Sequence, residues 1–238
     1  MSAAKLSKKE LKEDEFLSTF ERVLRHLSLH PKRYLGLGSV VLLLLVALSF
    51  SLTYLERNES KARLTLSKAN QVYRENLALL DQNSPYERRG IPDFEKPLKL
   101  YQDVIEQFPR TRAATEALYQ SARCLHHLSR WGEAIEAYTR YLQRSPRGEF
   151  SLLAALGLGN CYEQKGELDK AAEVYSTALH RQGNDPLRGE LMVSLGRCQE
   201  ALGKKEEAIR TYREIGEKFP NSIWKSYADR KLLYLKGR

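Results

Sequence analysis

The longest apolar stretch of the chain runs from Tyr34 to Leu55 and contains no charged residue. A helix needs about 20 predominantly apolar residues to cross the hydrocarbon core of a bilayer, so this stretch is long enough. A cleaved secretory signal would have a shorter apolar core close to the start, whereas 33 residues precede this one. The pattern therefore predicts a retained transmembrane helix over residues 34–55.

The segments on either side of this stretch are polar. Residues 1–33 contain eight Lys/Arg and five Asp/Glu, with apolar side chains at helical spacing at Phe16, Leu17, Phe20, Val23, Leu24 and Leu27. This spacing predicts an amphipathic N-terminal tail that lies on lipid headgroups or packs against a neighbour. After the stretch, residues 60–81 favour a polar helix. The breakers Pro85, Gly90, Pro92 and Pro97 then predict a loop over residues 82–97.

From Leu98 onward the sequence repeats with a fixed period. Cys124, Cys161 and Cys198 are separated by 37 residues each time. The same interval relates four further sets, which are Ala122, Gly159 and Gly196; Ala134, Ala171 and Ala208; Tyr101, Tyr138, Tyr175 and Tyr212; and Pro109, Pro146, Gly183 and Pro220. Agreement at several positions at once is typical of a repeat architecture.

Each repeat contains two apolar helical stretches separated by a short turn, at Ser129-Arg130, Gly166-Glu167 and Gly203-Lys204. The pattern predicts full helical hairpins over about residues 115–146, 152–183 and 189–220. These hairpins belong to a domain of residues 56–238, with partial or capping units before and after them. Alanine and glycine on the first helix of each hairpin allow the second to approach closely. The recurring tyrosines are expected to bury their rings between hairpins.

The order of small, aromatic and breaker positions resembles the tetratricopeptide repeat. The best unit is LGNCYEQKGELDKAAEVYSTAL, from Leu158 to Leu179. Other units depart from the pattern, because Gln199 replaces an aromatic residue, Lys205 replaces a large packing residue and Ser129 replaces the turn glycine. The resemblance implies an all-α fold in which an N-terminal transmembrane helix precedes a tetratricopeptide-type helical solenoid.

The chemistry-bearing residues do not form a pattern typical of an enzyme or of a cofactor or metal site. The three cysteines are too widely spaced for a zinc site, and equivalent positions about 10 Å apart cannot form a disulfide, so buried thiols are expected. The five histidines belong to no HExxH motif, and there is no phosphate-binding glycine loop or nucleophile elbow. Basic residues exceed acidic ones by nine but are scattered, which disfavours nucleic-acid binding.

The inner faces of the first helices are the predicted partner-binding groove. In tetratricopeptide proteins the groove-lining positions correspond here to Tyr119, Arg123, His127, Leu156, Asn160, Gln164, Val193, Arg197 and Ala201. Chaperone-receptor repeats hold a peptide C-terminus with a two-carboxylate clamp, and only Asn160 sits where that clamp requires it. The mixed aromatic, apolar and basic lining favours an extended or helical protein segment with some acidic character. A merely solvated concave face is the alternative.

The segments FPRTRAATEALYQSARC (Phe108 to Cys124) and FPNSIWKSYADRKL (Phe219 to Leu232) resemble repeats of the BamD and YbgF/CpoB families of bacterial envelope proteins. The layout of tail, uncleaved anchor and repeat domain resembles the YfgM-like proteins associated with the Sec translocon. This resemblance implies a single-pass inner (cytoplasmic) membrane protein with a periplasmic repeat domain. Its partners would be the translocon, chaperones or emerging envelope proteins, and its role a scaffold for protein translocation, folding or assembly.

The orientation in the membrane follows only weakly from charge. Residues 19–33 and 56–70 each hold four Lys/Arg, although Lys32 and Arg33 lie directly against the apolar edge and favour the tail inside. Two alternatives to a periplasmic scaffold for protein translocation, folding or assembly stay open. One is a receptor that faces the cytosol, and the other is an envelope organiser that self-associates through its solenoid.

Overall fold

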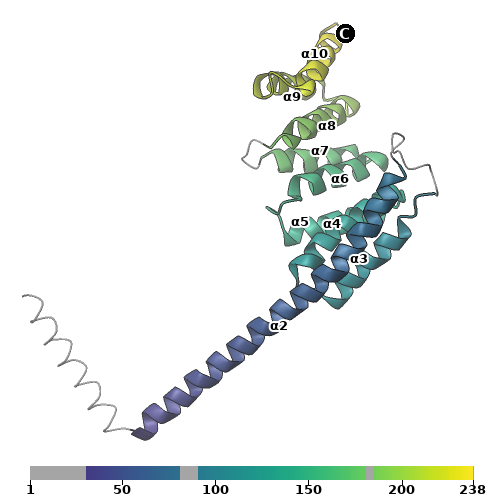
Figure 1. Cartoon of the computed structure of the whole chain (residues 1–238). Helices are drawn as coiled ribbons and strands as arrows, with labels where there is room; N and C mark the ends of the chain where they lie inside the picture. The colour runs from purple at the N-terminus through teal and green to yellow at the C-terminus, as the bar shows by residue number, and fades with distance from the viewer. Residues whose placement is uncertain (1–30, 81–90, 181–184, 238) are drawn as a thin grey trace, which may run out of the picture. The chain divides into compact units, whose positions relative to one another are not determined.

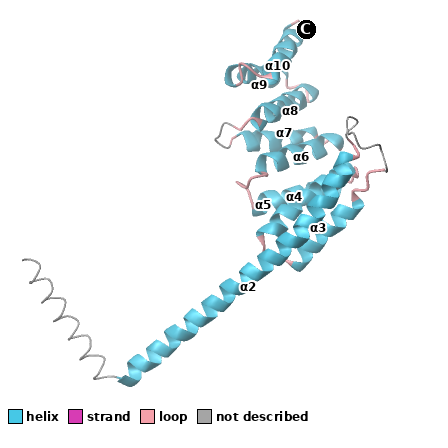
Figure 2. Ribbon diagram, viewed as in Figure 1, coloured by secondary structure: helices cyan, strands magenta, loops and turns pink. Residues whose placement is uncertain are grey.

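The computed structural model describes residues 31–80, 91–180 and 185–237. The chain divides into two units, Met1–Glu56 and Arg57–Arg238. All regular elements in the described ranges are helices, which confirms the all-α prediction (Figures 1 and 2). Most of the predicted amphipathic tail lies outside the described residues, as does the greater part of the predicted loop. The helices are α2 (Pro31–Ala78), α3 (Glu95–Gln107), α4 (Arg112–His127), α5 (Trp131–Arg144), α6 (Ser151–Gln164), α7 (Leu168–Leu179), α8 (Leu187–Ala201), α9 (Lys205–Lys218) and α10 (Ile223–Lys236).

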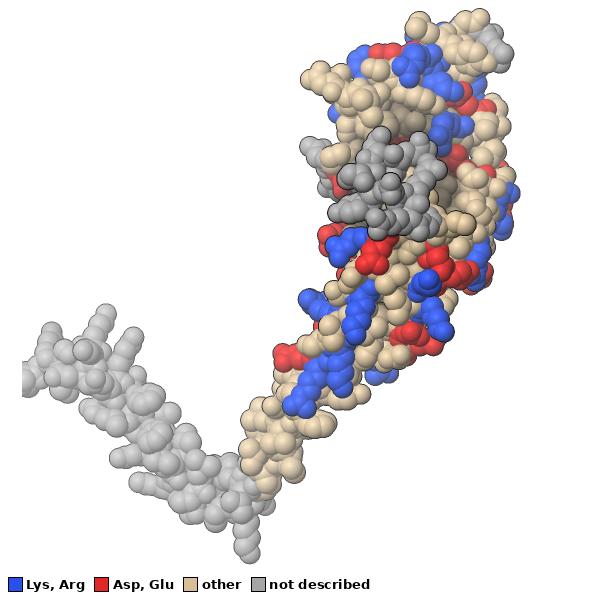
Figure 3. Space-filling model, turned by 45° about the vertical axis from the view of Figure 1, so that its right-hand side comes forward, with Lys and Arg blue, Asp and Glu red and all other residues tan. Residues whose placement is uncertain are grey.

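The predicted transmembrane stretch lies in α2, and its side chains from Ser39 to Leu55 are exposed. Its large apolar side chains from Val40 to Leu55 are all more than half accessible, and in the space-filling view this part carries no charged side chain (Figure 3). Among the described helices it is the one long and apolar enough to cross a membrane. The helix does not end at Leu55, because no glycine or proline interrupts the sequence between Ser39 and Ser84.

Residues 57–238 form a solenoid of helical hairpins. α4 pairs with α5, α6 with α7 and α8 with α9, and each hairpin packs on the next (Figure 1). The first helices of successive hairpins also contact one another, from α4 to α6, α6 to α8 and α8 to α10. They therefore form one layer of the solenoid, and α5, α7 and α9 form the other. On the face drawn in Figure 3, charges of both signs are interspersed over this unit.

A further hairpin precedes these three. The second half of α2 supplies Ala62, Leu66, Ala69 and Tyr73 to a core shared with α3 and α4. Tyr101 on α3 donates a hydrogen bond from its hydroxyl to Asn70 Oδ1 of α2, at 2.7 Å. The predicted loop was too long at one end, because α3 begins at Glu95 and buries Pro97 in its first turn. Proline is tolerated there since the first-turn N–H groups have no partner inside the helix.

The predicted turns between paired helices are confirmed. Ser129, Gly166 and Gly203 have φ angles of 56°, 75° and 73°, and they are spaced by the repeat period. The residue after each donates its N–H to a carbonyl five residues earlier, as from Glu167 to Tyr162 at 2.9 Å. This is the Schellman arrangement, which ends a helix and reverses the chain.

The repeat positions form the core as predicted. Tyr101, Tyr175 and Tyr212 are fully buried and Tyr138 is 3% exposed. Gly159 faces the ring of Tyr175, and Gly196 faces that of Tyr212, so closely that a methyl group added at either would lie less than 3.0 Å from ring atoms. The three cysteines are buried and unpaired, also as predicted. Burial raises the pKa of each thiol to about 12.

Candidate protein-binding groove

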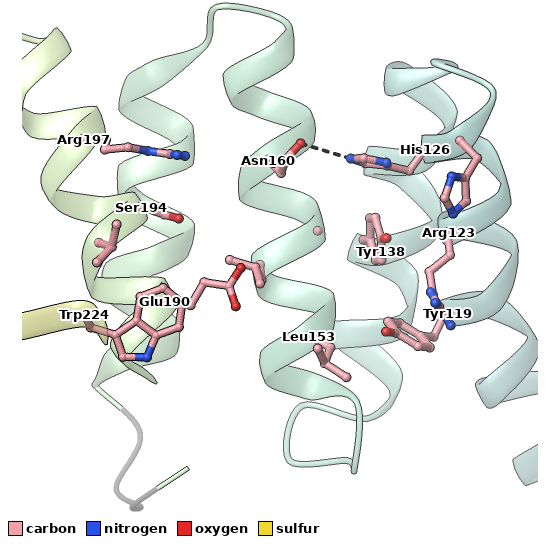
Figure 4. A pocket seen from close by; sticks show the side chains of 14 residues that line it. Tyr119, Arg123, His126, Tyr138, Leu153, Asn160, Glu190, Ser194, Arg197 and Trp224 are labelled. Carbon is pink, nitrogen blue, oxygen red and sulfur yellow. Dashed lines mark hydrogen bonds between the residues drawn. The ribbon is translucent and has the colours of Figure 1, made fainter. Parts of the chain in front are cut away.

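The first helices and the start of α10 enclose a groove of about 380 Å³ in the repeat domain (Figure 4). Tyr138 of α5 also lines this groove. The groove is lined by Tyr119, Arg123, His126 and His127 of α4, Tyr138 of α5, Leu153, Leu156, Gly157 and Asn160 of α6, Glu190, Val193, Ser194 and Arg197 of α8, and Trp224 of α10.

Seven of the nine predicted groove residues line this one groove. One exception is Gln164, the last residue of α6, which lies beyond the groove next to the turn; Ala201, the last residue of α8, is outside it as well. The predicted residues that line the groove are therefore the first two from each of α4, α6 and α8, together with His127 at the end of α4.

Two of the predicted groove residues, Tyr119 and Val193, are also part of the hydrophobic core. Tyr119 is 5% exposed and Val193 is 8% exposed. The ring of Tyr119 stacks on Phe150 with centroids 4.7 Å apart and an interplanar angle of 2°. Phe150 is the last residue of the irregular connection between α5 and α6, so this connection helps to bury Tyr119.

Arg123 is fixed by aromatic rings. Its guanidinium carbon lies 4.7 Å from the ring centroid of Tyr73 and 5.7 Å from that of Tyr119. One guanidinium nitrogen donates to Gln120 Oε1 at 3.0 Å. Burial raises the pKa of Tyr73 to about 12, although the positive charge of Arg123 opposes this, so the phenol stays protonated at neutral pH. The groove thus presents a cation held over π faces.

The two adjacent histidines make different contacts. His126 donates from Nε2 to Asn160 Oδ1 at 3.0 Å, which ties α4 to α6 across the groove (Figure 4). His127 stacks on Phe94 with centroids 4.1 Å apart, and its Nε2 lies 3.1 Å from the hydroxyl oxygen of Tyr73. Burial, together with the nearby charges of His126 and Arg123, lowers the pKa of His127 below 6.5. Its imidazole is therefore neutral at pH 7.

In the next two repeats, ion pairs take the place of the hydrogen bond between His126 and Asn160. At the equivalent positions one repeat later, Glu163 pairs with Arg197 at 3.1 Å. In the following repeat Glu200 pairs at 3.0 Å with Lys231, which lies three residues before the position equivalent to Arg197. Glu163 also accepts a hydrogen bond from Tyr175, at 2.6 Å. Consequently the charge of Arg197 is partly balanced inside the protein, whereas that of Arg123 is not.

Sequence reasoning missed a row of groove residues. Leu153 and Glu190 lie three residues before Leu156 and Val193, and therefore on the same helix faces, and they are themselves one repeat apart. Their spacing could have identified them. Trp224 had no such signal, since α10 follows the last full hairpin and the indole packs against Gly189 of α8.

In the described ranges, no three His, Cys, Asp or Glu side chains gather closely enough to hold a metal ion. The groove instead offers ring faces, apolar side chains and hydrogen-bonding groups over a surface the length of several residues. Such a surface is suited to contact another polypeptide.

Two family models described as tetratricopeptide repeat match the chain, one over residues 93–149 and the other over 150–215. Among solved structures, the MamA RS-1 ArsTM double mutant is 16% identical, with a TM-score of 0.56 over 75% of this chain and 84% of that one. MamA 41-end from Desulfovibrio magneticus RS-1 is 16% identical, with a TM-score of 0.51 over 72% and 85%. YrrB, described as a TPR protein with an unusual peptide-binding site, is 18% identical, with a TM-score of 0.51 over 71% and 74%.

No curated protein sequence matches the chain. The solved structures show likeness of fold, and the narrower resemblance to YfgM-like proteins stays a prediction. Tetratricopeptide domains bind proteins or peptides, which makes the repeat domain a scaffold for protein interactions. With hairpins, turns and core positions all recurring at one interval, and with both family matches falling on them, residues 93–215 are tetratricopeptide repeats and the chain is a tetratricopeptide repeat protein.

Proposed function

We propose that the protein is a membrane-anchored scaffold whose groove holds a segment of a partner protein. The observation that carries this proposal is the convergence of side chains from α4, α6, α8 and α10 on one groove. Four consecutive repeats contribute to it, so a bound segment would contact side chains from all of them. Leu153 and Leu156 provide apolar contact, and Asn160 and Arg123 provide polar groups. A protein segment with apolar and some acidic side chains fits this lining.

The anchor in this proposal is the apolar part of α2. An exposed run of large apolar side chains of this length is costly in water, because each buried side chain of that kind gains about 1.5–3 kcal/mol. A lipid bilayer provides the apolar surroundings that the run requires. The proposal places residues 34–55 across the membrane and leaves residues 56–238 in the aqueous phase as the interaction domain.

We place the protein in the inner membrane with the repeat domain in the periplasm, where it would assist translocation, folding or assembly of envelope proteins. The support is the resemblance in layout to YfgM-like proteins and the pair Lys32 and Arg33 at the tail side of the apolar edge. Free thiols would be a liability in an oxidising compartment, but the burial of Cys124, Cys161 and Cys198 removes this objection.

The groove is tested by a photocrosslinking amino acid at Leu156, in the full-length protein in its own membranes. A matched site is Arg210, which is exposed on α9 and lies outside the groove. We expect discrete protein adducts from position 156 and none from position 210. Equal adducts from both positions, or none from position 156, would contradict binding in the groove.

The location of the domain is tested separately. A reporter enzyme that is active only in the periplasm, fused after Arg238, is expected to be active. An inactive fusion, combined with activity of a matching cytoplasmic reporter, would instead favour a receptor that faces the cytosol. This second result would leave the crosslinking result at Leu156 unaffected.

A further inference from the structure

The charges in the groove are of both signs and are not all balanced within the protein. Arg197 pairs with Glu163, as described above. Among the described residues, no carboxylate lies within ion-pair distance of Arg123. Glu190 also lines the groove and is partly buried, and no hydrogen bond or ion pair with a described residue involves its carboxylate. A partly buried charge without a partner loses hydration, so a ligand of opposite charge would be favoured beside it.

These two charges lie on opposite sides of the groove. Figure 4 shows Glu190 extending from α8 into the groove beside Trp224, while Arg123 and Tyr119 lie across from it on α4. Between the two sides α6 presents Leu153, Leu156 and Gly157, on which the ring of Tyr138 packs. On α8 the charge of Arg197 is balanced by Glu163, so the remaining charges make the groove acidic at the α8 side and basic at the α4 side, with the two leucines of α6 between them.

The acidic side has a second feature that selects a cation. Trp224 packs so closely on Gly189 that a methyl group added to the glycine would lie less than 3.0 Å from three atoms of the indole. The position of the ring is thereby fixed next to Glu190. A carboxylate and an indole face together are suited to a lysine or arginine side chain, through a charge-assisted hydrogen bond and a cation–π contact.

We propose that the groove selects a bipolar protein segment. One basic side chain binds to Glu190 beside Trp224, apolar side chains cover Leu153 and Leu156, and an acidic group faces Arg123. This inference rests on the proposed function and deepens it, because it replaces a general preference for acidic segments with a defined order of charges. Glu190 is the residue that determines this specificity.

The test uses the full-length protein in lipid nanodiscs and short blocked peptides that share one apolar centre. The flanks of the peptides are bipolar in either order, all acidic, all basic or uncharged. We expect one bipolar peptide to bind about tenfold more tightly than any other, as one charge-assisted hydrogen bond would give. Fluorescence anisotropy measures the affinities at low salt, where the difference is largest.

Substitutions at Glu190 then separate charge from shape. Glu190→Gln should weaken the bipolar peptide about tenfold and leave the all-acidic peptide unchanged. Glu190→Lys should make the all-acidic peptide the tightest ligand. The matched control is Glu136→Lys, which makes the same change of charge at an exposed position of α5 outside the groove, and it should leave the ranking as in the wild type.

Two outcomes would overturn the inference in different ways. If the all-acidic peptide binds the wild type as tightly as the bipolar ones and Glu190→Gln changes neither affinity, the bipolar proposal is wrong and an acid-selective groove remains. If no peptide binds and the crosslinker at Leu156 also yields no adduct, the proposed function itself is wrong.

Discussion

Glycine in a helix has opposite effects on stability at two positions of this domain, and the difference depends on what faces it. Gly196 on α8 faces the ring of Tyr212, and a Cβ there would lie 2.6 Å from ring carbon Cε1. Gly216 on α9 has no atom within 4 Å of the position of a Cβ. The first glycine is required by packing, whereas the second only costs helix propensity.

Replacing each glycine by alanine tests this distinction. Gly196→Ala should lower the free energy of unfolding by about 1–3 kcal/mol, because the tightly packed tyrosine ring must shift. Gly216→Ala should raise it by about 0.5–1 kcal/mol, because alanine loses less backbone entropy on folding. Urea unfolding followed by circular dichroism measures both. The packing explanation fails if the two substitutions change stability in the same direction.

At the scale of elements, the link between α2 and α4 depends on Glu59. Its carboxylate accepts a hydrogen bond from the N–H of Arg112, the first residue of α4, at 2.8 Å, and one from Arg63 Nε at 2.9 Å. Thr111 caps the same helix end by accepting from the N–H of Ala114 at 3.0 Å. The two side chains satisfy donors that have no partner inside the helix. The negative charge also complements the positive end of the helix dipole.

This link should depend on pH. Partial burial alone would raise the pKa of Glu59, but the hydrogen bonds from Arg63 and from the backbone of Arg112 and Ala113 outweigh it and lower the pKa below 4.5. A carboxyl whose pKa is lower in the folded state stabilises the fold above its unfolded pKa. The contribution is therefore present at pH 7 and is lost as the pH falls below 4.5 and through the lowered value.

We expect Glu59→Gln to lower the free energy of unfolding by about 1 kcal/mol at pH 7. The difference from the wild type should shrink as the pH is lowered from 7 toward 3, which urea unfolding at several pH values would measure. Glu136→Gln is the control, because this exposed residue of α5 should change stability by less than about 0.5 kcal/mol. A difference that is constant over the whole pH range would show that the charge of Glu59 does not stabilise the link.

The parts of the fold that the sequence could predict are those that recur along the chain. Hairpins, turns and buried tyrosines follow from residues that recur at 37-residue intervals, and each is decided by contacts within one or two repeats. Tyr119 stacks on Phe150, in the irregular connection between α5 and α6, and the positions one repeat away from Phe150 hold Ala113 and Leu187 instead of an aromatic residue. The place of Trp224 in the groove depends on α10, beyond the last complete repeat. Features that occur once leave no periodic signal.

At the scale of the whole molecule, the two units differ in where their apolar side chains are. In residues 57–238 the apolar repeat positions are buried in cores of their own, contributed by every hairpin. In the preceding unit the large apolar side chains from Val40 to Leu55 are exposed. Repeat domains are stabilised by contacts within each hairpin and with its neighbours. The second unit should accordingly fold without the first, and the first should require lipid.

Removing residues 1–56 tests this division. We expect residues 57–238 to be soluble without detergent and strongly helical, whereas the full chain should stay in the membrane fraction after carbonate extraction. Leu44→Arg combined with Ala47→Arg should release the full chain, because each arginine near the centre of a membrane helix costs about 2.5–3.5 kcal/mol. A matched pair of arginines at Ser67 and Gln71, which are exposed in the polar half of α2, should leave it in the membrane.

If the full chain is extracted by carbonate without any substitution, the apolar stretch does not anchor it. If residues 57–238 pellet with membranes by themselves, the domain binds lipid or a membrane partner through its own surface, and the apolar stretch cannot be the sole attachment.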